Sequence, residues 1–329
     1  MSQELCQGPQ PIANGTRAIL HGIAVTHLRS SDGATAIVAD HGAHLLSWCP
    51  ASGVEALYLS PTSRFGAVDA IRGGVPVIFP QFGEQGPGKR HGIARVLPWR
   101  LLSVTIKDGA AVAWLALQGR LDLPDNQESH DSQDSQDSQE SQESQESQRA
   151  GAAAYRLLLE MRLQGESLQL GLTIDNIGSA AWSCQAALHT YLRVDALVQC
   201  GVDGLQECRF IDQTAGSVVA TQAPARLDFF AEVDRIYTDA PSPLLLCDGQ
   251  RRLGVAQHGF TDTVLWNPGA IKAAALTDLP AQGYQKFICI EAAVIATPLT
   301  LEPGTCWRAS QRLTMLPGRA QADCSPANR

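Results

Sequence analysis

The stretch that decides the fold reads Tyr155-Arg-Leu-Leu-Leu-Glu-Met-Arg-Leu163, then Gln164-Gly-Glu-Ser167, then Leu168-Gln-Leu-Gly-Leu-Thr-Ile174. On both arms an apolar side chain stands at every second position, which is the period of a half-buried strand and not of a helix. Because the short connection contains a glycine, the two arms predict an antiparallel hairpin.

Short strand-like runs recur along the rest of the chain, separated by clusters of Gly, Pro, Asn and Asp. No long run of period 3.6 with helix caps accompanies them. This pattern predicts an all-β fold, a large antiparallel β-sandwich with few short helices. The strands expected outside the hairpin cover residues 35–39, 55–60, 111–118, 187–194, 244–247, 263–266, 285–295 and 308–315.

The chain has 329 residues, of which 44% are hydrophobic, and we expect one β-sandwich domain over residues 1–329. A Ser-Gln-rich segment with an acidic residue at nearly every third position lies at 127–149. Because it offers almost nothing apolar to bury, it is predicted to be a disordered loop insert. Residues 1–12 and the tail at 318–329 are expected to be loose.

The same insert accounts for the acidic balance of the chain. It contains seven acidic residues and one arginine, a net charge of −6, so the remainder carries −2 of the total −8. A nearly neutral fold without a basic stripe argues against a nucleic-acid partner. No apolar run approaches the roughly 20 residues of a membrane span, so we expect no membrane partner. The N-terminus lacks a signal-peptide pattern, which predicts a cytoplasmic protein.

The nine cysteines are odd in number and widely scattered. None forms a C-x-x-C pair or another metal-ligand spacing, so the sequence indicates no metal site. Reduced thiols of a cytosolic protein are the simpler interpretation.

Two arginines lie in Gly-rich, Pro-punctuated sequence that reads Ile71-Arg-Gly-Gly-Val-Pro-Val-Ile-Phe-Pro-Gln-Phe-Gly83, followed by His91-Gly-Ile-Ala-Arg95. The guanidinium group presents a planar fork of donors that matches a phosphate, and it keeps its charge near neutral pH. Neighbouring glycines let the backbone approach a ligand closely. Arg72 and Arg95 are therefore candidate anion-binding residues, with structural bridging of loops as the alternative.

The intervening loop nearly matches a phosphate-binding P-loop. Gly83, Gly88 and Lys89 stand at the expected positions, but Arg90 occupies the place of the Ser or Thr that binds magnesium. The following residues do not read as a helix, so the helix dipole of a P-loop is missing as well. We reject a nucleotide site and interpret Lys89 and Arg90 as a solvated face of the loop.

A lone histidine and a lone glutamate stand in apolar strand-like runs. His189 shares a predicted strand face with Ala187 and Tyr191. Glu291 follows Phe287-Ile-Cys-Ile290, where a carboxylate is costly unless it is paired or functional. Burial would raise the pKa of this carboxyl toward that of a useful base. The two are a candidate acid/base pair, with a core histidine and a buried structural ion pair as the alternatives.

Two further residues stay open between a structural and a ligand-binding role. Asp234 in Val233-Asp-Arg-Ile-Tyr237 is an acid of the kind that forms turns or surface salt bridges. Trp266 in Trp266-Asn-Pro268 either ends a strand in the core or offers a flat face to a sugar ring.

Six short motifs, in the order in which they occur along the chain, resemble those of the hexose-6-phosphate mutarotases, or glucose-6-phosphate 1-epimerases, of the aldose 1-epimerase superfamily. The match extends from about residue 15 to about residue 316 and leaves out the Ser-Gln insert. The motifs are Arg72-Gly-Gly with Phe79-Pro-Gln-Phe-Gly83, His91-Gly-Ile-Ala-Arg95, Leu188-His-Thr-Tyr191, Val233-Asp-Arg-Ile-Tyr237, Trp266-Asn-Pro268 and Cys289-Ile-Glu291.

The resemblance implies a galactose mutarotase-like sandwich and an isomerase, expected as a monomer, that needs neither a metal nor an organic cofactor. It implies that Arg72 and Arg95 hold the 6-phosphate of the hexose. It also implies that Glu291 takes a proton from the C1 hydroxyl while His189 donates one to the ring oxygen. The ring then opens and recloses as the other anomer. Substrate contacts are implied for His91, Asp234 and Trp266.

Two departures from the family pattern lie beside these residues. Arg90 precedes His91, where the family often has a small or amide residue, and Gly269 follows Pro268, where a second Trp is common.

Three other functions compete with this one. An aldose 1-epimerase for unphosphorylated sugars would have no obvious use for the paired arginines. A non-catalytic sugar-phosphate-binding module would bind on the same sandwich without turnover. A glycoside hydrolase would need a second buried acid across the scissile bond.

Overall fold

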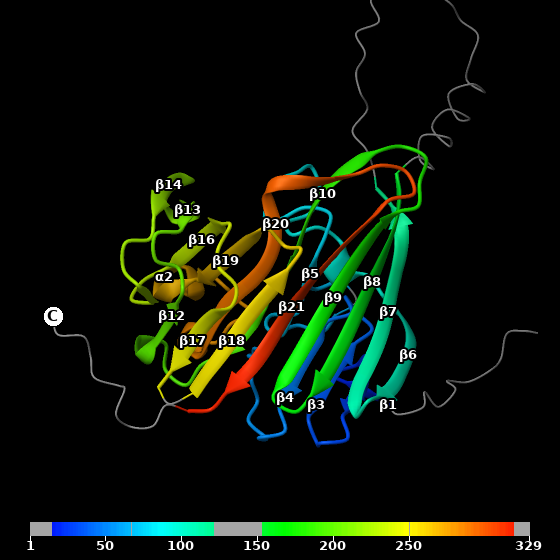
Figure 1. The fold of residues 1–329 in the computed structure, drawn as a ribbon, viewed down its shortest axis with the longest axis horizontal. Coiled ribbons are helices and arrows are strands. Elements are labelled where there is room, and N and C mark those ends of the chain that lie inside the picture. The colour runs from blue at the N-terminus through cyan, green and yellow to red at the C-terminus, as the bar shows by residue number, and fades with distance from the viewer. Residues whose placement is uncertain (1–14, 67, 122–152, 250, 319–329) are drawn as a thin grey trace, which may run out of the picture.

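The structure is a computed structural model, and it describes residues 15–66, 68–121, 153–249 and 251–318. In these residues three antiparallel sheets form nearly all of the regular structure, which confirms the all-β prediction (Figure 1). The insert predicted at 127–149, the loose residues 1–12 and all but Gly318 of the predicted tail lie outside the described residues. The helical segments are α2 (Gly269–Ala274), η1 (Ala94–Val96), η2 (Leu197–Gln199), η3 (Gln213–Ala215) and η4 (Gly283–Lys286).

The largest sheet contains nine strands, and its long central strands lie side by side in Figure 1. The predicted hairpin forms two of them, with Leu163 opposite Leu168 and Leu157 opposite Ile174. In sheet order the strands are β15 (Arg226–Asp228), β12 (Cys200–Asp203), β17 (Leu244–Asp248), β18 (Arg251–His258), β21 (Cys306–Leu316), β9 (Ser167–Asn176), β8 (Ala154–Gln164), β7 (Ala110–Arg120) and β6 (Arg100–Lys107).

The second sheet contains eight strands and carries the site. In order these are β14 (Val218–Thr221), β13 (Arg209–Asp212), β16 (Val233–Thr238), β19 (Asp262–Asn267), β20 (Phe287–Leu301), β10 (Trp182–Leu188) and β5 (Val77–Ile78), with β11 (Tyr191–Arg193) also paired to β20. A third sheet of four strands consists of β1 (Gly15–Leu20), β2 (Ile23–Arg29), β3 (Thr35–Ala39) and β4 (Leu45–Cys49).

The main hydrophobic core takes buried side chains from all three sheets, among them Trp48, Leu159 and Ile290. Burying a large aliphatic or aromatic side chain contributes roughly 1.5–3 kcal/mol, so this shared core holds the sheets together. The alternating leucines of β8 and β9 face it, as their period predicts. Within the described residues, no helix is long and apolar enough to cross a membrane.

Residues 287–295 of β20 are buried on both faces, which explains the nearly continuous apolar sequence there. Ile288 and Ile290 face the main core, whereas Phe287 and Cys289 belong to a second, smaller apolar cluster. Because side chains alternate along a strand, Glu291 points to the side of the second cluster. The sheet therefore places one carboxyl group among apolar side chains.

Two predicted strands differ from the structure. The strand expected at 187–194 is interrupted, because β10 ends at Leu188 and β11 begins at Tyr191. The prediction at 55–60 is wrong, since these residues form only isolated bridges at Leu57 and Leu59. There the Glu55 carboxylate accepts backbone N–H donors at 3.0 and 2.9 Å, one of them from within the predicted strand, and so competes with ladder pairing.

Candidate active site

The candidate acid/base pair forms where β10 is interrupted. His189 lies in the two-residue gap before β11, and its Nδ1 is 3.3 Å from Oε1 of Glu291 in β20. Both side chains are buried, with exposed fractions of 8% and 1%. Within the described residues, neither His189 Nδ1 nor Glu291 Oε2 has a hydrogen-bond partner. The two groups are close but unsatisfied, an arrangement suited to a ligand that bonds to both.

The surroundings of the pair shift both pKa values in the direction that favours the neutral forms of the two side chains. Burial raises the pKa of Glu291 well above 4.5, and the negative charge of Asp234 adds to the effect. Burial lowers the pKa of His189 well below 6.5, and nearby positive charges act in the same direction. Without a bound anion, the pair therefore favours one proton, held on Glu291, beside a neutral imidazole.

Both side chains open into a cavity of about 630 Å³, a size typical of small-molecule sites. The structure brings every site residue expected from the sequence to its lining. Besides the acid/base pair, these are Arg72, His91, Arg95, Asp234 and Trp266.

Both candidate phosphate-binding arginines reach the cavity, but they are held differently. Arg72 contacts Asp278 and the hydroxyl of Tyr191. Arg95 donates from Nη2 to the backbone carbonyl of Arg90 at 2.7 Å, and its buried Nε has no partner among the described residues. Burial lowers the pKa of Arg95 to about 10, so the group stays charged at neutral pH. A buried charged donor without an acid partner is suited to bind an anion.

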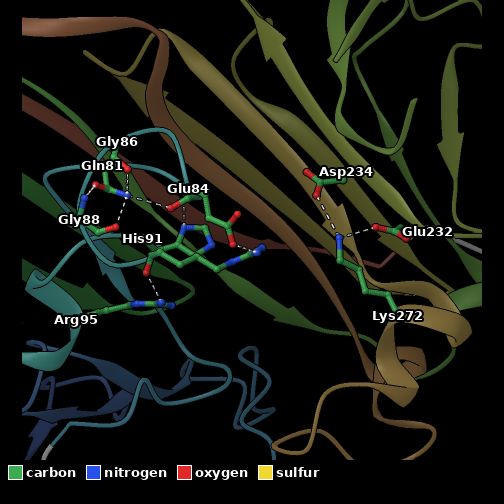
Figure 2. A network of polar contacts seen from close by, with 11 residues as sticks. Gln81, Glu84, Gly86, Gly88, His91, Arg95, Glu232, Asp234 and Lys272 are labelled. Atoms are coloured by element: carbon green, nitrogen blue, oxygen red, sulfur yellow. Dashed lines mark hydrogen bonds and ion pairs between the residues drawn. The ribbon is translucent and has the colours of Figure 1, made fainter. Parts of the chain in front are cut away.

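The side-chain amide of Gln81 braces the loop between the two arginine segments. Its Oε1 accepts from the backbone N–H of Gly88 at 2.7 Å, and its Nε2 donates to the carbonyl of the same residue at 3.2 Å (Figure 2). Arg90 pairs with Glu84 at 3.4 Å and lines the cavity while 56% of its side chain stays exposed. The interpretation of Arg90 as only a solvated face is therefore incomplete.

His91 stands at the base of this loop with a left-handed φ of 62°. Its Nδ1 accepts the backbone N–H of Gly83 at 3.2 Å. Burial lowers the pKa of His91 to about 3, and the charge of Arg95 contributes to the shift. A neutral imidazole that accepts a hydrogen bond is consistent with both observations.

Two further charged side chains line the cavity, Asp234 from β16 and Lys272 from α2 (Figure 2). Lys272 Nζ lies 2.7 Å from Glu232 Oε1 and 3.8 Å from Asp234 Oδ2. Burial raises the pKa of Asp234, while the charge of Lys272 opposes that shift. No sequence pattern marks Lys272, because α2 is a six-residue helix without a recognisable motif.

Aromatic rings fix the orientation of His189. Tyr191 stacks on its imidazole with a centroid distance of 4.8 Å and an interplanar angle of 8°. The Trp266 indole meets the same ring edge-on, at 5.8 Å and 82°. Trp266 is 9% exposed, so it is at once a core residue and part of the cavity wall.

One group in the described residues has a donor set that suits a metal ion. Donor atoms of His189, Cys289 and Glu291 all lie within 4.8 Å of one another. A His/Cys/carboxylate set matches the preferences of zinc. The charges of Arg72 and Arg95 act on the same histidine, however, and they disfavour a cation there.

Gly73 allows the segment next to Arg72 to approach the neighbouring chain. Its φ is +112°, and a Cβ at this position would lie 2.3 Å from the carbonyl oxygen of Tyr58. Gly73→Ala is therefore expected to lower the free energy of unfolding by about 1–3 kcal/mol, measured by urea denaturation. Gly53→Ala is the matched control, because Gly53 has a φ of +84° but open space around it. Equal losses in the two variants would contradict a role for the close approach.

Comparisons with known proteins agree with this architecture. A crystal structure of a Salmonella typhimurium protein provisionally named a mutarotase superposes with a TM-score of 0.77 at 25% identity, covering 95% of this chain and 97% of that one. A galactose mutarotase-like protein from Clostridium acetobutylicum gives a TM-score of 0.66 at 14% identity, covering 92% and 98%. The fold is thus that of the galactose mutarotase-like proteins.

The sequence also matches the family described as aldose 1-epimerase over residues 25–124 and 126–314. The chain belongs to the aldose 1-epimerase family, which confirms the resemblance seen in its motifs. A Cenchrus ciliaris relative is 29% identical over 320 residues, covering 94% of this chain and 90% of its own. An Escherichia coli K12 relative is 31% identical over 281 residues, covering 80% and 85%. Both carry the provisional name glucose-6-phosphate 1-epimerase.

Proposed function

We propose that this protein is a hexose-6-phosphate mutarotase that interconverts the α and β anomers of glucose-6-phosphate by acid/base ring opening and reclosure. One observation carries the proposal. A single cavity holds a buried His–Glu pair together with two arginines, one of which has a buried N–H without a partner among the described residues. The names of the two relatives support the same substrate.

The chemistry needs one proton on the pair. Glu291, as carboxylate, accepts the proton of the C1 hydroxyl, while His189, as imidazolium, donates a proton to the ring oxygen. The C1–O5 bond breaks and C1 becomes the free aldehyde. The C1–C2 bond then rotates, and the C5 hydroxyl attacks the other face of the carbonyl group. Both proton transfers are reversed in this step, and the product is the other anomer. Each positioned group contributes about 10²- to 10⁴-fold.

The 6-phosphate helps to create this protonation state. The positive charges of Arg72 and Arg95 lower the pKa of His189. A phosphate bound between these guanidinium groups offsets their charge, so the pKa of His189 rises when the substrate binds. The proton then shifts from Glu291 to His189, which is the tautomer that the reaction requires. Binding energy from the remote phosphate is in this way used at the reacting centre.

The other cavity residues have roles that fit the same substrate. Asp234 accepts hydrogen bonds from sugar hydroxyls, and Trp266 offers an apolar ring to a face of the sugar. Neutral His91 shapes the loop beside the phosphate. The shared core of the three sheets supports a single domain, and the free thiols of the seven described cysteines support a cytoplasmic location.

The direct test is the rate of anomer exchange of glucose-6-phosphate, followed by NMR, with glucose measured in parallel. Wild type should accelerate exchange of the phosphosugar. Arg72→Ala should lower kcat/KM for it by about 10- to 100-fold, because a hydrogen bond to a charged group contributes roughly 1.5–3 kcal/mol. Arg64→Ala is the matched control, since Arg64 is an exposed arginine that contacts Thr277.

Two outcomes would contradict the proposal. Equal acceleration of glucose, unaffected by Arg72→Ala, would indicate a mutarotase for unphosphorylated sugars. Binding of glucose-6-phosphate without acceleration of either sugar would indicate a non-catalytic sugar-phosphate-binding module.

A further inference from the structure

The guanidinium group of Arg72 is held by two fixed partners. Its Nε and Nη2 lie 3.2 and 3.1 Å from Oδ2 of Asp278, and its Nη1 donates to the Tyr191 hydroxyl at 3.1 Å. Asp278 follows α2 and is 206 positions away from Arg72 in the sequence. Neither the motifs nor their spacing predict this ion pair.

These contacts leave part of the guanidinium group free. Arginine has five N–H donors in one plane, one on Nε and two on each Nη. Hydrogen bonds to Asp278 and Tyr191 occupy the Nε donor and one donor on Nη1, and Nη2 makes an ion-pair contact with the same Asp278 oxygen at 3.1 Å. One donor on Nη1 and one on Nη2 therefore remain for a ligand. Two such donors in a fixed plane match two oxygens of a phosphate.

The two partners differ in their position relative to the cavity. Arg72 and Tyr191 line it, whereas Asp278 does not. Asp278 thus contacts the guanidinium from outside the cavity lining, so its carboxylate leaves the cavity side of Arg72 open to a phosphate.

The backbone on both sides of the ion pair is anchored to the same turn. The Ser60 hydroxyl donates to the carbonyl of Asp278 at 2.7 Å. The backbone N–H of Arg72 donates to the Ser63 hydroxyl at 2.7 Å. Because both residues are fixed to residues 60–63, their separation is set by the fold, and the side-chain contact needs no reorganisation when a ligand arrives.

We propose that Asp278 is a positioning residue for substrate binding. It holds the plane of Arg72 so that the free donors of Nη1 and Nη2 meet the 6-phosphate. This inference rests on the proposed function. It assigns to Asp278 a role in the preference for phosphorylated over unphosphorylated hexoses.

A simple counter-ion would behave in the opposite way. If Asp278 only neutralised Arg72, removing it would expose more positive charge and tighten phosphate binding. If Asp278 orients Arg72, its removal leaves the Arg72 side chain flexible. Substrate binding is then weaker, because the conformational entropy of that side chain is lost only when the substrate binds.

The test is a double-mutant cycle of Arg72→Ala and Asp278→Ala, with anomer exchange as the measurement. Asp278→Ala alone should raise KM for glucose-6-phosphate about 10-fold, within the coupling range of residues in one network, and change kcat less than about threefold. Rates with glucose should not change. In the Arg72→Ala background, Asp278→Ala should have no further effect on KM.

Two further variants separate positioning from loss of structure. Asp278→Asn keeps a hydrogen-bond acceptor and should show a smaller rise in KM. This variant also tests the inference if the alanine variant does not fold. Asp228→Ala is the matched control, because Asp228 pairs with Arg226 at 2.9 Å in β15, away from the cavity lining.

Three results would overturn the inference. They are a lower KM in Asp278→Ala, an equal loss with glucose, or an undiminished effect in the Arg72→Ala background. Each is distinct from failure of the proposed function, in which wild type itself shows no acceleration or Arg72→Ala changes nothing.

Discussion

Glu291→Gln should slow anomer exchange of glucose-6-phosphate by about 10²- to 10⁴-fold. The amide has nearly the same volume as the carboxyl group, so packing in β20 is preserved, but it cannot accept the C1 hydroxyl proton. The loss should appear in kcat, because the phosphate contacts of Arg72 and Arg95 are untouched. NMR exchange spectroscopy at saturating substrate measures it directly.

The same substitution should stabilise the fold at neutral pH. Burial raises the pKa of Glu291 well above 4.5 in the folded state. The folded protein therefore binds more protons here than the unfolded chain, and its stability falls as pH rises from 4.5 through the folded pKa. Glutamine has no charge to bury, so the variant does not lose stability in this way. A variant that is more stable but less active is a common form of the trade-off between stability and activity.

Urea denaturation of both proteins at pH 7 and pH 5 tests this part of the prediction. The stability gap between variant and wild type should be larger at pH 7 than at pH 5. A gap that is the same at both values would contradict a buried ionisable Glu291, and a rate within a few-fold of wild type would contradict its catalytic role.

His189→Gln should also lower the rate by about 10²- to 10⁴-fold, because the variant has no group that donates a proton to the ring oxygen. Its effect on pH dependence is as informative. A second proton on the pair inactivates the enzyme at acidic pH, and loss of the single proton inactivates it at alkaline pH. Wild-type kcat should therefore fall on both sides of a maximum, whereas the residual activity of the variant needs only the Glu291 carboxylate and should lack the alkaline decline.

The profile is best measured in kcat and not in kcat/KM, since a sugar phosphate itself loses its second proton near pH 6, as phosphorylated side chains do. His258→Gln is the matched control, because His258 is exposed in β18. A rate close to wild type in His189→Gln would show that the imidazole is not the proton donor.

The buried pair has a structural consequence for the sheet that carries it. Residues 287–295 of β20 are apolar except at Glu291, and His189 lies in the gap between β10 and β11, which both pair with β20. Each feature disfavours a regular, stable sheet, because an unpaired buried carboxyl group and an interrupted strand both cost free energy. We infer that the shared core of three sheets compensates for them.

Long strands with a clear period were predictable, and short ones were not. The hairpin strands β8 and β9 have 11 and 10 residues and alternate over most of their length, and their register follows from the turn. By contrast, β13, β14 and β15 have only three or four residues, and Val218 and Val219 of β14 are both exposed. Their pairing depends on neighbours far away in the sequence, so no local pattern marks them.

The sequence by itself determined the all-β class and, through the order of its motifs, seven of the residues that line the cavity, because alternation and short motifs are local properties. Only the tertiary structure decided the interruption at His189, the inclusion of Arg90 and Lys272 in the cavity lining, and the contact between Asp278 and Arg72. It also decided the protonation of the acid/base pair. Burial and the distance between charges set these features, and both arise from packing segments that lie hundreds of residues apart.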